Sequence, residues 1–367
     1  MNILITGGAG FIGSHTADRL IEEGHNVIIF DNLEKQVHNN KIPEYLNKKC
    51  DFVLGDVRNK EELKKILKNV DVIYHFAARV GVGQSMYEIS DYIETNVMGT
   101  ANIFDIIVKE NIKNIKKIIV ASSMSIYGEG AYSCDICKTI VYPQERQIEN
   151  GWDFVCCNKK MRILPVTESK PLYPNSVYAV SKKDQEIYSL ILGKTYKIPV
   201  VALRYFNIYG SRQALSNPYT GVCAIFLSNI LNNNPVNIYE DGQQLRDFVN
   251  IKDIVEANYL AMINDSANYQ VFNVGSGSPI TICNIADFLM KKLDVKKDLK
   301  FISGKYRVGD VRNCIANIDK IKKMLNFEPK YDFYSGCDEL INWVKNQKSE
   351  DKTSNMNIDL QSKGLLK

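Results

Sequence analysis

Residues 3–13 of this 367-residue chain are Ile3-Leu4-Ile5-Thr6-Gly7-Gly8-Ala9-Gly10-Phe11-Ile12-Gly13. The apolar residues at the start predict a short buried strand, and the glycines after them recur at every third position from Gly7 to Gly13. Glycines at this spacing allow a tight turn after a strand, and they let backbone N–H groups at the start of a helix approach a pyrophosphate. The stretch therefore predicts a strand–turn–helix unit that binds a dinucleotide.

Short apolar runs alternate with helical patterns through residues 1–204, which is the order expected of a parallel sheet covered by helices. The expected strands are residues 3–5, 27–30, 52–54, 72–76, 117–121 and 200–204. The expected helices are residues 13–24, 60–69, 91–110 and 178–197. The sequence thus predicts an α/β protein with a Rossmann-type, doubly wound parallel sheet.

The spacing of these elements divides the chain into three parts. Residues 1–204 form the expected dinucleotide-binding domain, which carries a cysteine-bearing insert at residues 130–168. Beyond it the elements become shorter, and we expect residues 205–347 to form mainly a smaller substrate-binding lobe that partly returns to the first domain. Residues 348–367 have almost no aromatic or β-branched content, so we expect a disordered tail.

Asp31 follows the second expected strand, where a carboxylate can accept a hydrogen bond from a ribose 2′-hydroxyl. The same carboxylate would repel the 2′-phosphate of NADP. No arginine lies between Asp31 and Asn40, and Lys35 is the only lysine in that stretch. The sequence therefore favours NAD over NADP as the cofactor.

The composition argues against two classes of partner. The formal net charge of +4 is spread along the chain without a dense basic block, so we expect no binding to nucleic acid. No apolar run approaches the roughly 20 residues that cross a bilayer, so we expect no membrane association and a cytoplasmic protein. In that compartment the nine cysteines are expected to be thiols or metal ligands rather than disulfides.

Tyr178 and Lys182 stand four residues apart in an expected helix, so their side chains leave the same face one turn apart. An ammonium close to a phenol stabilises the phenolate and lowers the pKa of the tyrosine below its usual value of about 10. Such a tyrosine can take a proton from an alcohol near neutral pH. By itself the pair is also typical of a solvated helix surface, and its interpretation depends on the motifs around it.

Several further motifs occur in the order and number of one known family. They are Gly55-Asp56-Val57, His75-Phe76-Ala77-Ala78, Ser122-Ser123-Met124-Ser125-Ile126-Tyr127-Gly128, Arg204-Tyr205-Phe206-Asn207-Ile208-Tyr209-Gly210 and Arg246-Asp247-Phe248-Val249. With the glycine loop and the Tyr178/Lys182 pair, they make residues 1–345 resemble an extended short-chain dehydrogenase/reductase of the nucleotide-sugar epimerase and dehydratase branch.

The resemblance implies a role for each matching residue. Ser123 would hydrogen-bond the reacting sugar oxygen, Tyr178 would be the base, and Lys182 would hold the nicotinamide ribose. The implied cofactor-binding residues are Gly7, Gly10, Phe11, Ile12, Gly13, Asp31, Asn32, Asp56, Val57, Phe76, Ala77, Ala78, Asn96, Tyr178 and Lys182. The implied substrate-binding residues are Ser85, Ser125, Asn207, Tyr239, Arg246, Arg307 and Asp310. The alternative for Arg307 is a simple ion pair with Asp310.

Within this branch, the residues beside the reactive hydroxyl indicate the reaction. The resemblance implies an Asp-Glu pair there in 4,6-dehydratases and a glutamate in decarboxylases, whereas this chain has Ser123-Met124-Ser125. A simple reductase would usually use NADPH, which Asp31 disfavours. The remaining expectation is a NAD-dependent nucleotide-sugar 4-epimerase, which oxidises C4 transiently and reduces it on the opposite face. The resemblance also implies a homodimer formed through the helices at residues 91–110 and 178–197.

The insert contains Cys134-Asp-Ile-Cys137 and then Cys156-Cys157. C-x-x-C is half of a tetrahedral zinc site, and a second cysteine pair about twenty residues further on gives the usual spacing. We therefore expect these four cysteines to hold a structural zinc ion. The alternatives are a loop without metal and free thiols, because Lys159 stands where a second C-x-x-C would place its last cysteine.

The insert, with residues 75–87 and 210–221, also makes the chain resemble the dTDP-L-rhamnose 4-epimerase group. That group interconverts dTDP-L-rhamnose and dTDP-6-deoxy-L-talose, which is the expected reaction. UDP-glucose and UDP-N-acetylhexosamine 4-epimerases are alternatives, because pocket shape decides the sugar. An alternative of a different class is a zinc-knuckle interaction scaffold without catalysis, although a scaffold has no need of Ser123, Tyr178 and Lys182.

Overall fold

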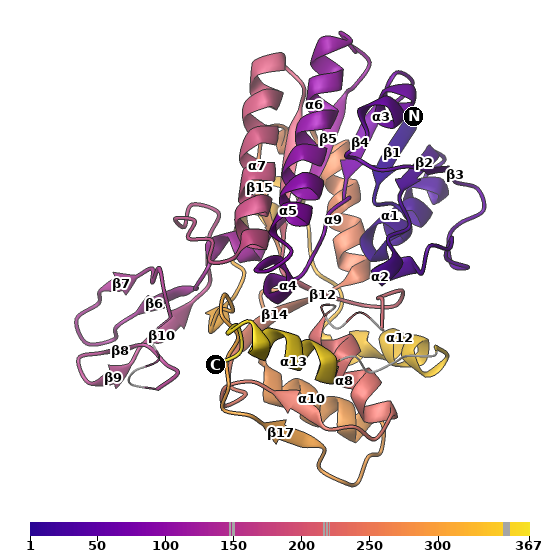
Figure 1. Ribbon diagram of the computed structural model, residues 1–367. Helices are drawn as coiled ribbons and strands as arrows, with labels where there is room; N and C mark the ends of the chain where they lie inside the picture. Colours follow the sequence, from indigo (N-terminus) through magenta and orange to yellow (C-terminus); the bar gives the residue numbers. More distant parts are fainter. Residues whose placement is uncertain (147, 149–150, 216, 218, 220, 348–352) are drawn as a thin grey trace.

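Seven parallel strands form a sheet at the centre of the described part of the chain (Figure 1). The structure is a computed structural model that describes residues 1–367 except 147, 149–150, 216, 218, 220 and 348–352. Across the sheet the strands are β15 (Val271–Val274), β11 (Val200–Tyr205), β5 (Lys117–Ser123), β4 (Val72–His75), β1 (Asn2–Thr6), β2 (Asn26–Asp31) and β3 (Asp51–Leu54). The strand order reverses between β1 and β4, and ligands of such sheets bind at that point. The predicted Rossmann-type fold is confirmed.

All six predicted strands occur, and β15 is an additional strand that the sequence does not predict. β15 pairs with β11 at the edge of the sheet, so the chain returns to the sheet after residue 205. Its four residues lie among short, irregular elements, and a hydrophobic pattern of that length does not specify a partner strand.

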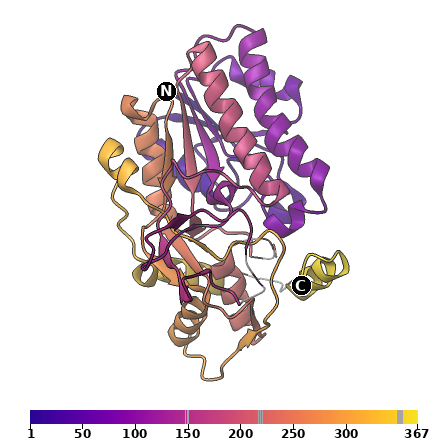
Figure 2. The ribbon, with the colours of Figure 1, turned by 90° about the vertical axis from the view of Figure 1, so that its left-hand side faces the viewer.

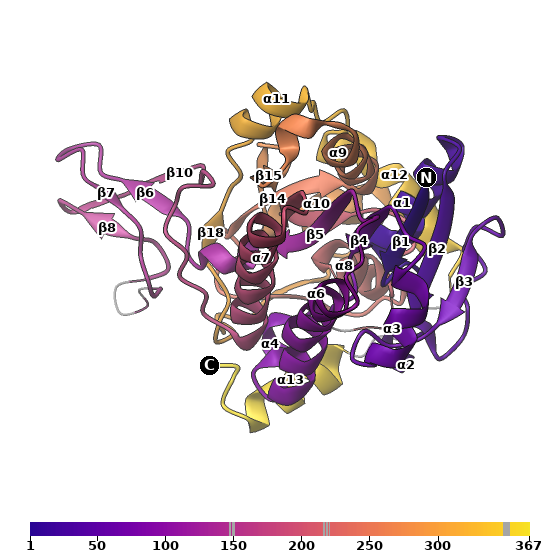
Figure 3. The ribbon, with the colours of Figure 1, turned by 90° about the horizontal axis from the view of Figure 1, so that it is seen from above.

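Helices cover both faces of the sheet (Figure 3). One layer consists of α3 (Lys60–Leu67), α6 (Gly99–Lys109) and α7 (Val177–Tyr196), and the other of α1 (Phe11–Glu22), α9 (Ile251–Ile263) and α11 (Asp319–Leu325). Within β1, Leu4 packs into the first layer while Ile3 and Ile5 pack into the second, because successive strand side chains point to opposite faces. No helix in the described ranges is both long and apolar enough to cross a membrane.

Residues 89–109 depart from the single helix predicted at 91–110. The segment begins with α5 (Ile89–Tyr92), continues as a π-helical stretch (Ile93–Met98) and ends as α6. Such wider turns are frequent at functional sites. Here the π-helical stretch carries Asn96, which is fully buried and contacts α7.

A second lobe with its own core lies below the sheet in Figure 1. It contains α8 (Val222–Leu231), α10 (Ile282–Lys292), α12 (Phe333–Lys345) and the parallel strand pair β13 (Val236–Ile238) and β17 (Lys300–Ile302). The paired strands β12 (Asn207–Tyr209) and β14 (Leu245–Asn250) lie between this core and the sheet. Because α9, β15 and α11 rejoin the sheet layers, the second lobe is not one continuous segment of the chain. The predicted domain limits at residues 204 and 347 therefore stay predictions.

The chain end forms regular structure, and the prediction of a disordered tail is wrong for residues 353–367. Residues 353–362 form α13 (Thr353–Ser362), and residues 348–352 lie outside the described chain. Three tail residues are buried, and they pack against Tyr87, Tyr219 and Tyr239; they are Met356, Leu360 and Leu366. Leucine and methionine suit a helix and supply this apolar contact without aromatic or β-branched residues.

The insert (residues 130–168) projects from the body of the molecule (Figures 1 and 3), and in Figure 2 it points toward the viewer. Its antiparallel strands are β6 (Ala131–Ser133), which pairs with β7 (Ile140–Val141) and β10 (Arg162–Leu164), and the hairpin of β8 (Val155–Cys156) and β9 (Lys159–Lys160). Its core is small and consists of Tyr132, Cys134, Phe154 and Met161 with three partly buried neighbours.

Candidate active site

A cavity of about 470 Å³ opens where the sheet strands end, and residues that follow β11, such as Asn207, Gln213 and Gly221, form part of its wall. Parallel strands that end at one edge bring their following residues together there. The predicted cofactor-binding residues that line the cavity are Gly7, Gly10, Phe11, Ile12, Gly13, Asp31, Asn32, Asp56, Val57, Phe76, Ala77, Ala78, Tyr178 and Lys182. Asn96 is buried behind the lining and does not face the cavity.

The glycine loop lies so close to the end of β4 that a side chain does not fit. Gly7 has a φ of +69°, and a Cβ on it would lie 2.7 Å from the backbone nitrogen of Ala77. A Cβ on Gly13 would lie 2.6 Å from the carbonyl oxygen of Gly7. Gly10 precedes α1 without a side-chain cap, so the first N–H groups of this helix are left for a ligand. The loop therefore fits the pyrophosphate of NAD.

Asp31 ends β2 and presents a buried carboxylate beside the loop. It accepts hydrogen bonds from the backbone N–H of Ala9 at 3.0 Å and of Leu33 at 2.8 Å. Burial raises the pKa of Asp31, and these two N–H donors oppose that shift. A carboxylate has further lone pairs, so Asp31 can also accept from a ribose hydroxyl, and the donor set fits NAD.

Asp56 is held in place by two neighbours at the far end of the cavity. Asn32 donates a hydrogen bond to it at 3.0 Å, the Arg58 side chain donates two, at 3.0 and 2.7 Å, and the Arg58 backbone N–H donates one at 2.8 Å. Burial opposes the ionisation of Asp56, but the hydrogen bonds from Arg58 outweigh it and lower the pKa of this carboxyl. Arg58 lines the cavity and is missing from the predicted set, although an arginine directly after Asp56-Val57 is a visible signal.

The residues predicted to be catalytic, Ser123, Tyr178 and Lys182, all line the same cavity. Ser123 is the last residue of β5, whereas Tyr178 and Lys182 lie one turn apart near the start of α7. The Ser176 side chain caps this helix by accepting from the backbone N–H of Ala179 at 3.1 Å. A strand end and a helix start thus bring the three side chains together.

Ser125 orients the hydroxyl of Ser123. The Ser123 oxygen accepts from the Ser125 backbone N–H at 3.1 Å and from the Ser125 hydroxyl at 2.9 Å. Because both acceptor positions are then occupied, the Ser123 proton is free for donation, and Ser123 lies close enough to Tyr178 to act on the pKa of the phenol. The structure thus connects Ser125 to Ser123, and the direct contact of Ser125 with a substrate stays a prediction.

Burial dominates the protonation of Tyr178 and Lys182. It raises the pKa of Tyr178, and the nearby Ser123 opposes this shift. It also lowers the pKa of Lys182 to about 7, although the nearby charge of Glu186 raises it. The low tyrosine pKa that the Tyr178/Lys182 pair predicts is therefore not found in this structure, because burial disfavours the charged form of both groups.

Buried hydrogen bonds fix α7 on the sheet. Glu186 accepts from Arg204 of β11 at 3.0 Å and from Ser122 of β5 at 2.6 Å. Asn96 donates to Ser181, the residue before Lys182, at 2.9 Å. These contacts hold the turn that carries Lys182. Glu186 is not among the predicted residues, although its position one helical turn after Lys182 already indicates that the two side chains share a face.

Three of the predicted substrate-binding residues lie in or near the cavity wall. Asn207, two residues after β11, lines the cavity, and Ser125 contacts Ser123. Ser85 ends the short helix α4 (Val82–Ser85), is fully buried, and donates to the carbonyl of Val82 at 2.7 Å. Of these three, only Asn207 faces the cavity directly.

The remaining predicted substrate residues lie outside the cavity lining and contact other protein groups. Arg307 donates to Asp310 at 2.8 Å, and its guanidinium lies 4.9 Å from the ring centre of Tyr239. Arg246 donates to the backbone carbonyl of Arg312 at 2.8 Å. The structure thus shows the ion-pair alternative for Arg307, and the roles of these residues toward a diphosphate stay predictions.

The chain end packs beside Tyr239 and Arg307. Asn357 of α13 accepts a hydrogen bond from the Tyr239 hydroxyl at 2.5 Å, and the backbone of residues 365–367 pairs with residues 306–308. Tyr219 packs against the same tail and lines the cavity. Tyr219 belongs to the 210–221 motif, of which residues 216, 218 and 220 lie outside the described chain.

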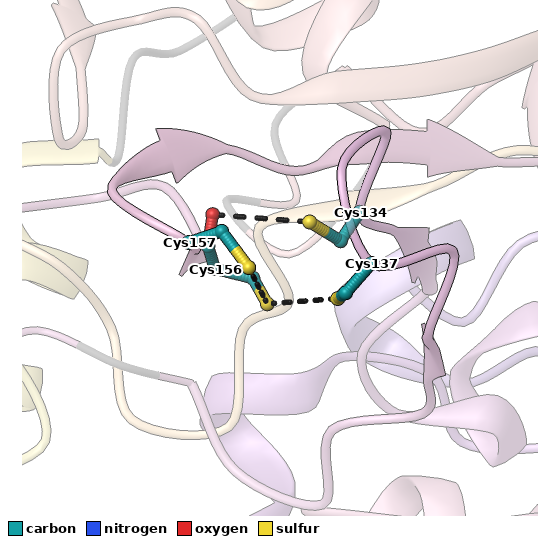
Figure 4. Close-up of side chains that lie close together, drawn as sticks. All are labelled: Cys134, Cys137, Cys156 and Cys157. Atoms are coloured by element: carbon teal, nitrogen blue, oxygen red, sulfur yellow. Dashed lines mark hydrogen bonds between the residues drawn. The ribbon is translucent and has the colours of Figure 1, made fainter.

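The four predicted metal ligands come together at the tip of the insert (Figure 4). The sulfurs of Cys134, Cys137, Cys156 and Cys157 all lie within 4.8 Å of one another, and all four cysteines are free. None of them lines the cavity, so any metal held there would be separate from the reacting groups.

Comparison with known proteins shows one family. The profile of the "NAD dependent epimerase/dehydratase family" matches residues 3–148 and 158–275. The interruption falls in the insert and leaves Cys156 and Cys157 outside the match. This part of the insert is therefore an addition to the shared family pattern.

Similar proteins share nearly the whole chain but differ in their reactions. One is the dTDP-L-rhamnose 4-epimerase of Burkholderia thailandensis, with 34% identity over 93% of this chain and 94% of that protein. Another is a UDP-N-acetyl-alpha-D-glucosaminuronate decarboxylase of Bacillus cytotoxicus, with 31% identity over 93% of this chain and 97% of that protein. Among solved structures, the UDP-glucose 4-epimerase of Thermus thermophilus in complex with NAD has a TM-score of 0.77 and 27% identity, covering 95% of this chain and all of that one.

Proposed function

Because the chain belongs to the NAD-dependent epimerase/dehydratase family, we propose that it is a nucleotide-sugar 4-epimerase. It is an enzyme that acts on nucleotide sugars, and its cofactor is NAD. The observation that carries the proposal is the meeting of Ser123, Tyr178 and Lys182 in one cavity, with no carboxylate at positions 124 and 125. The carboxylates that line the cavity are Asp31, Glu34 and Asp56, and they lie in or just after the strands of the cofactor end instead.

The proposed reaction begins at the C4 hydroxyl of the sugar. Tyr178 Oη takes the hydroxyl proton while Ser123 donates a hydrogen bond to the same sugar oxygen. Bound NAD would accept the C4 hydride and return it to the other face, and the charge of its oxidised ring would favour the phenolate of Tyr178. The 4-keto sugar turns over between the two steps, and Tyr178 then returns the proton. Lys182 would hold the cofactor ribose beside Tyr178.

The start of α7 supports the phenolate that this mechanism needs. Tyr178 is the second residue of the helix, where the peptide dipoles favour a negative charge. Before the sugar binds, the nearby Ser123 favours the same form. These two contributions oppose the effect of burial, which favours the neutral phenol.

For the substrate, we propose dTDP-L-rhamnose and its C4 epimer dTDP-6-deoxy-L-talose. The similarity to the Burkholderia thailandensis enzyme supports this sugar. UDP-glucose is an alternative that the similarity to the Thermus thermophilus structure supports, and UDP-N-acetylhexosamines are a further one. The decarboxylase relative makes a carboxylated sugar the competing substrate, but the chain has Met124 and Ser125 where the resemblance implies a glutamate.

The direct test is incubation of the purified protein with dTDP- and UDP-linked hexoses, 6-deoxyhexoses and hexuronates. Inversion at C4 in NMR spectra, without net consumption of NAD, is the expected result, and dTDP-L-rhamnose should have the highest kcat/KM. Release of carbon dioxide from a hexuronate, or loss of water from a hexose, would contradict the proposal. Inversion of a UDP-sugar with higher kcat/KM would keep the reaction and replace the substrate.

We also propose a homodimer that pairs through α7 and the segment before α6. On α7, Val180, Tyr188 and Ile191 are more than 40% exposed, and Ile93 and Met98 are similarly exposed on the neighbouring segment. Exposed large apolar groups that gather on one face are typical of an interaction surface. Sedimentation should give twice the chain mass, and Ile191→Lys should give the chain mass with NAD still bound. A monomeric wild-type protein would contradict the proposal.

A further inference from the structure

We propose that Cys134, Cys137, Cys156 and Cys157 bind one Zn²⁺, and that this ion fixes the insert against the second lobe. In a tetrahedral site with Zn–S bonds of about 2.3 Å, neighbouring sulfurs lie about 3.8 Å apart. The Sγ atoms of Cys137 and Cys156 are 3.6 Å apart, and those of Cys156 and Cys157 are 3.8 Å apart. These distances match the edge of such a tetrahedron and exceed the S–S bond of about 2.05 Å in a disulfide.

The backbone explains how two adjacent cysteines can share one ion. Successive side chains of a strand point to opposite faces, which would separate the sulfurs of Cys156 and Cys157. Cys157 and Asn158, however, form the turn between β8 and β9, with φ of +50° and +57°. The left-handed conformation directs the Cys157 side chain toward Cys156 (Figure 4). It costs a residue other than glycine about 1 kcal/mol, which a metal–sulfur bond offsets.

A tight turn brings the first two cysteines together. The carbonyl of Cys134 accepts from the Lys138 N–H at 2.9 Å, and the Cys134 N–H donates to the carbonyl of Thr139 at 3.0 Å. Cys137 lies inside this closed turn, and Lys138 after it has a φ of +61°. The turn therefore presents both sulfurs of the C-x-x-C unit on the side where Cys156 lies.

Among its described residues the insert has a small apolar core of its own, and ion pairs such as Arg146 with Glu240 join it to the second lobe. Its core has four buried side chains, among them Tyr132 and Phe154, whose ring centres are 4.4 Å apart. Units this small usually need a disulfide or a metal ion to hold their fold. Four thiolates in a tetrahedral arrangement without an open position are the ligand set of a structural zinc site.

Asp153 connects the insert to the second lobe. Arg312 is 1% exposed and donates to Asp153 at 3.2 Å, to Glu240 at 2.8 Å and to Asp241 at 2.6 Å. A buried guanidinium is costly unless its partners stay in place. Because Asp153 lies in the segment just before Cys156, an ion that holds Cys156 also holds the Asp153 contact. Tyr239, a predicted substrate-binding residue, directly precedes Glu240. The link from this network to substrate binding rests on the proposed function.

The metal is tested first by analysis of the full-length protein purified without chelator in the presence of a thiol reductant. The expected result is about one zinc per chain, in keeping with a closed four-cysteine site. Replacement of zinc by Co²⁺ should give the strong visible absorption and the sulfur-to-metal charge-transfer bands of a tetrahedral tetrathiolate site. Bound iron, a disulfide found by mass spectrometry, or failure to bind zinc and cobalt would overturn the proposal.

Variants identify the ligands. The double variant Cys137→Ser/Cys156→Ser should lose the zinc and keep NAD, whereas Cys50→Ala, outside the cluster, should keep both. If the double variant retains a full equivalent of zinc, the four cysteines are not the site. The cobalt spectrum of the wild-type protein gives the answer independently of whether the double variant folds.

The fixing of the insert is tested by hydrogen exchange and by kinetics. Removal of zinc should speed exchange at residues 153–160 and 239–241, and unchanged exchange at 239–241 would overturn the coupling to the lobe. With the sugar nucleotide that turns over, zinc-free enzyme should show a KM raised about 5-fold, the equivalent of one lost hydrogen bond, at unchanged kcat. If no sugar nucleotide reacts, the proposed function fails, while the metal analysis, the cobalt spectrum and the exchange data still decide this proposal.

Discussion

The cofactor half and the substrate half of the site differ in what their side chains contact. In the cofactor half, Gly7 and Asp31 are fixed by close backbone contacts and face an open cavity. In the substrate half, Arg246 and Arg307 point at carbonyls and a carboxylate of the protein itself. The first half is thus formed before a ligand binds, whereas Arg246 and Arg307, in their predicted substrate roles, would have to exchange protein contacts for ligand contacts. Rigid packing suits a cofactor that stays bound, and exchangeable contacts suit a substrate that leaves.

Loss of the proposed base should have the largest effect and should leave the cofactor half intact. Tyr178→Phe should lower kcat about 1000-fold, because a positioned acid–base group contributes about 10²- to 10⁴-fold. NAD content, measured on the denatured protein, should not change. Tyr196→Phe, at the exposed end of the same helix, is the matched control and should keep wild-type rates. More than a tenth of the activity in Tyr178→Phe would assign the base to another group.

A methyl group at Gly7 should damage the cofactor half itself. Gly7→Ala places a Cβ 2.7 Å from the backbone of Ala77, and such overpacking costs about 3 kcal/mol. Affinity for NAD, followed by fluorescence titration, should fall about 100-fold. Gly24 is the control because its φ of +79° resembles that of Gly7, while nothing lies within 4 Å of a Cβ there. Equal losses in both variants would show that backbone strain, not the contact with β4, is responsible.

The sequence predicts the cofactor half because local rules determine it. Glycine spacing sets the loop, and Asp31 is placed by ending the next strand. Tyr178 and Lys182 need only a helix to share a face. Their meeting with Ser123 follows once β5 is recognised as a strand, since parallel strands end at one edge. Each of these inferences uses residues that are close in the sequence.

The sequence fails where contacts join distant segments. Arg246 bonds a carbonyl sixty-six positions away, and Tyr239 bonds Asn357 across 118 positions. The pKa of Tyr178 is another case, because its burial depends on elements from several parts of the chain, such as Tyr92, whose ring packs edge-on against it. Residue patterns specify which groups are present, but they do not specify which elements exclude water from them.

The buried ammonium of Lys182 should make stability depend on pH. Its pKa is about 7 in the fold and about 10.5 in the unfolded chain, so the cost of burying the charge is fully present below pH 7. Between these values the unfolded chain binds more protons, and the stability of the fold rises with pH. NAD-free Lys182→Met should therefore be more stable than wild type by about 2 kcal/mol at pH 6, with a smaller difference at pH 9.

Denaturant unfolding at the two pH values measures this difference. Lys194→Met, on the exposed part of the same helix, is the control and should show no comparable change with pH. A difference between Lys182→Met and wild type that grows toward pH 9 would contradict the direction of the pKa shift. The expected difference would show that the buried ammonium of Lys182 destabilises the cofactor half before NAD binds. That would sharpen the comparison with the substrate half.

The smallest effect is expected from the chain end, which belongs to the substrate half. Deletion of residues 353–367 removes the Asn357 contact of Tyr239 and the backbone pairing that holds residues 306–308 around Arg307. The loss of about 1 kcal/mol should raise KM for the nucleotide sugar about 5-fold, with kcat and NAD content unchanged. Asn357→Ala should give part of this increase. A lower KM would mean that α13 occupies space the nucleotide needs, and an unchanged KM would separate Tyr239 and Arg307 from substrate binding.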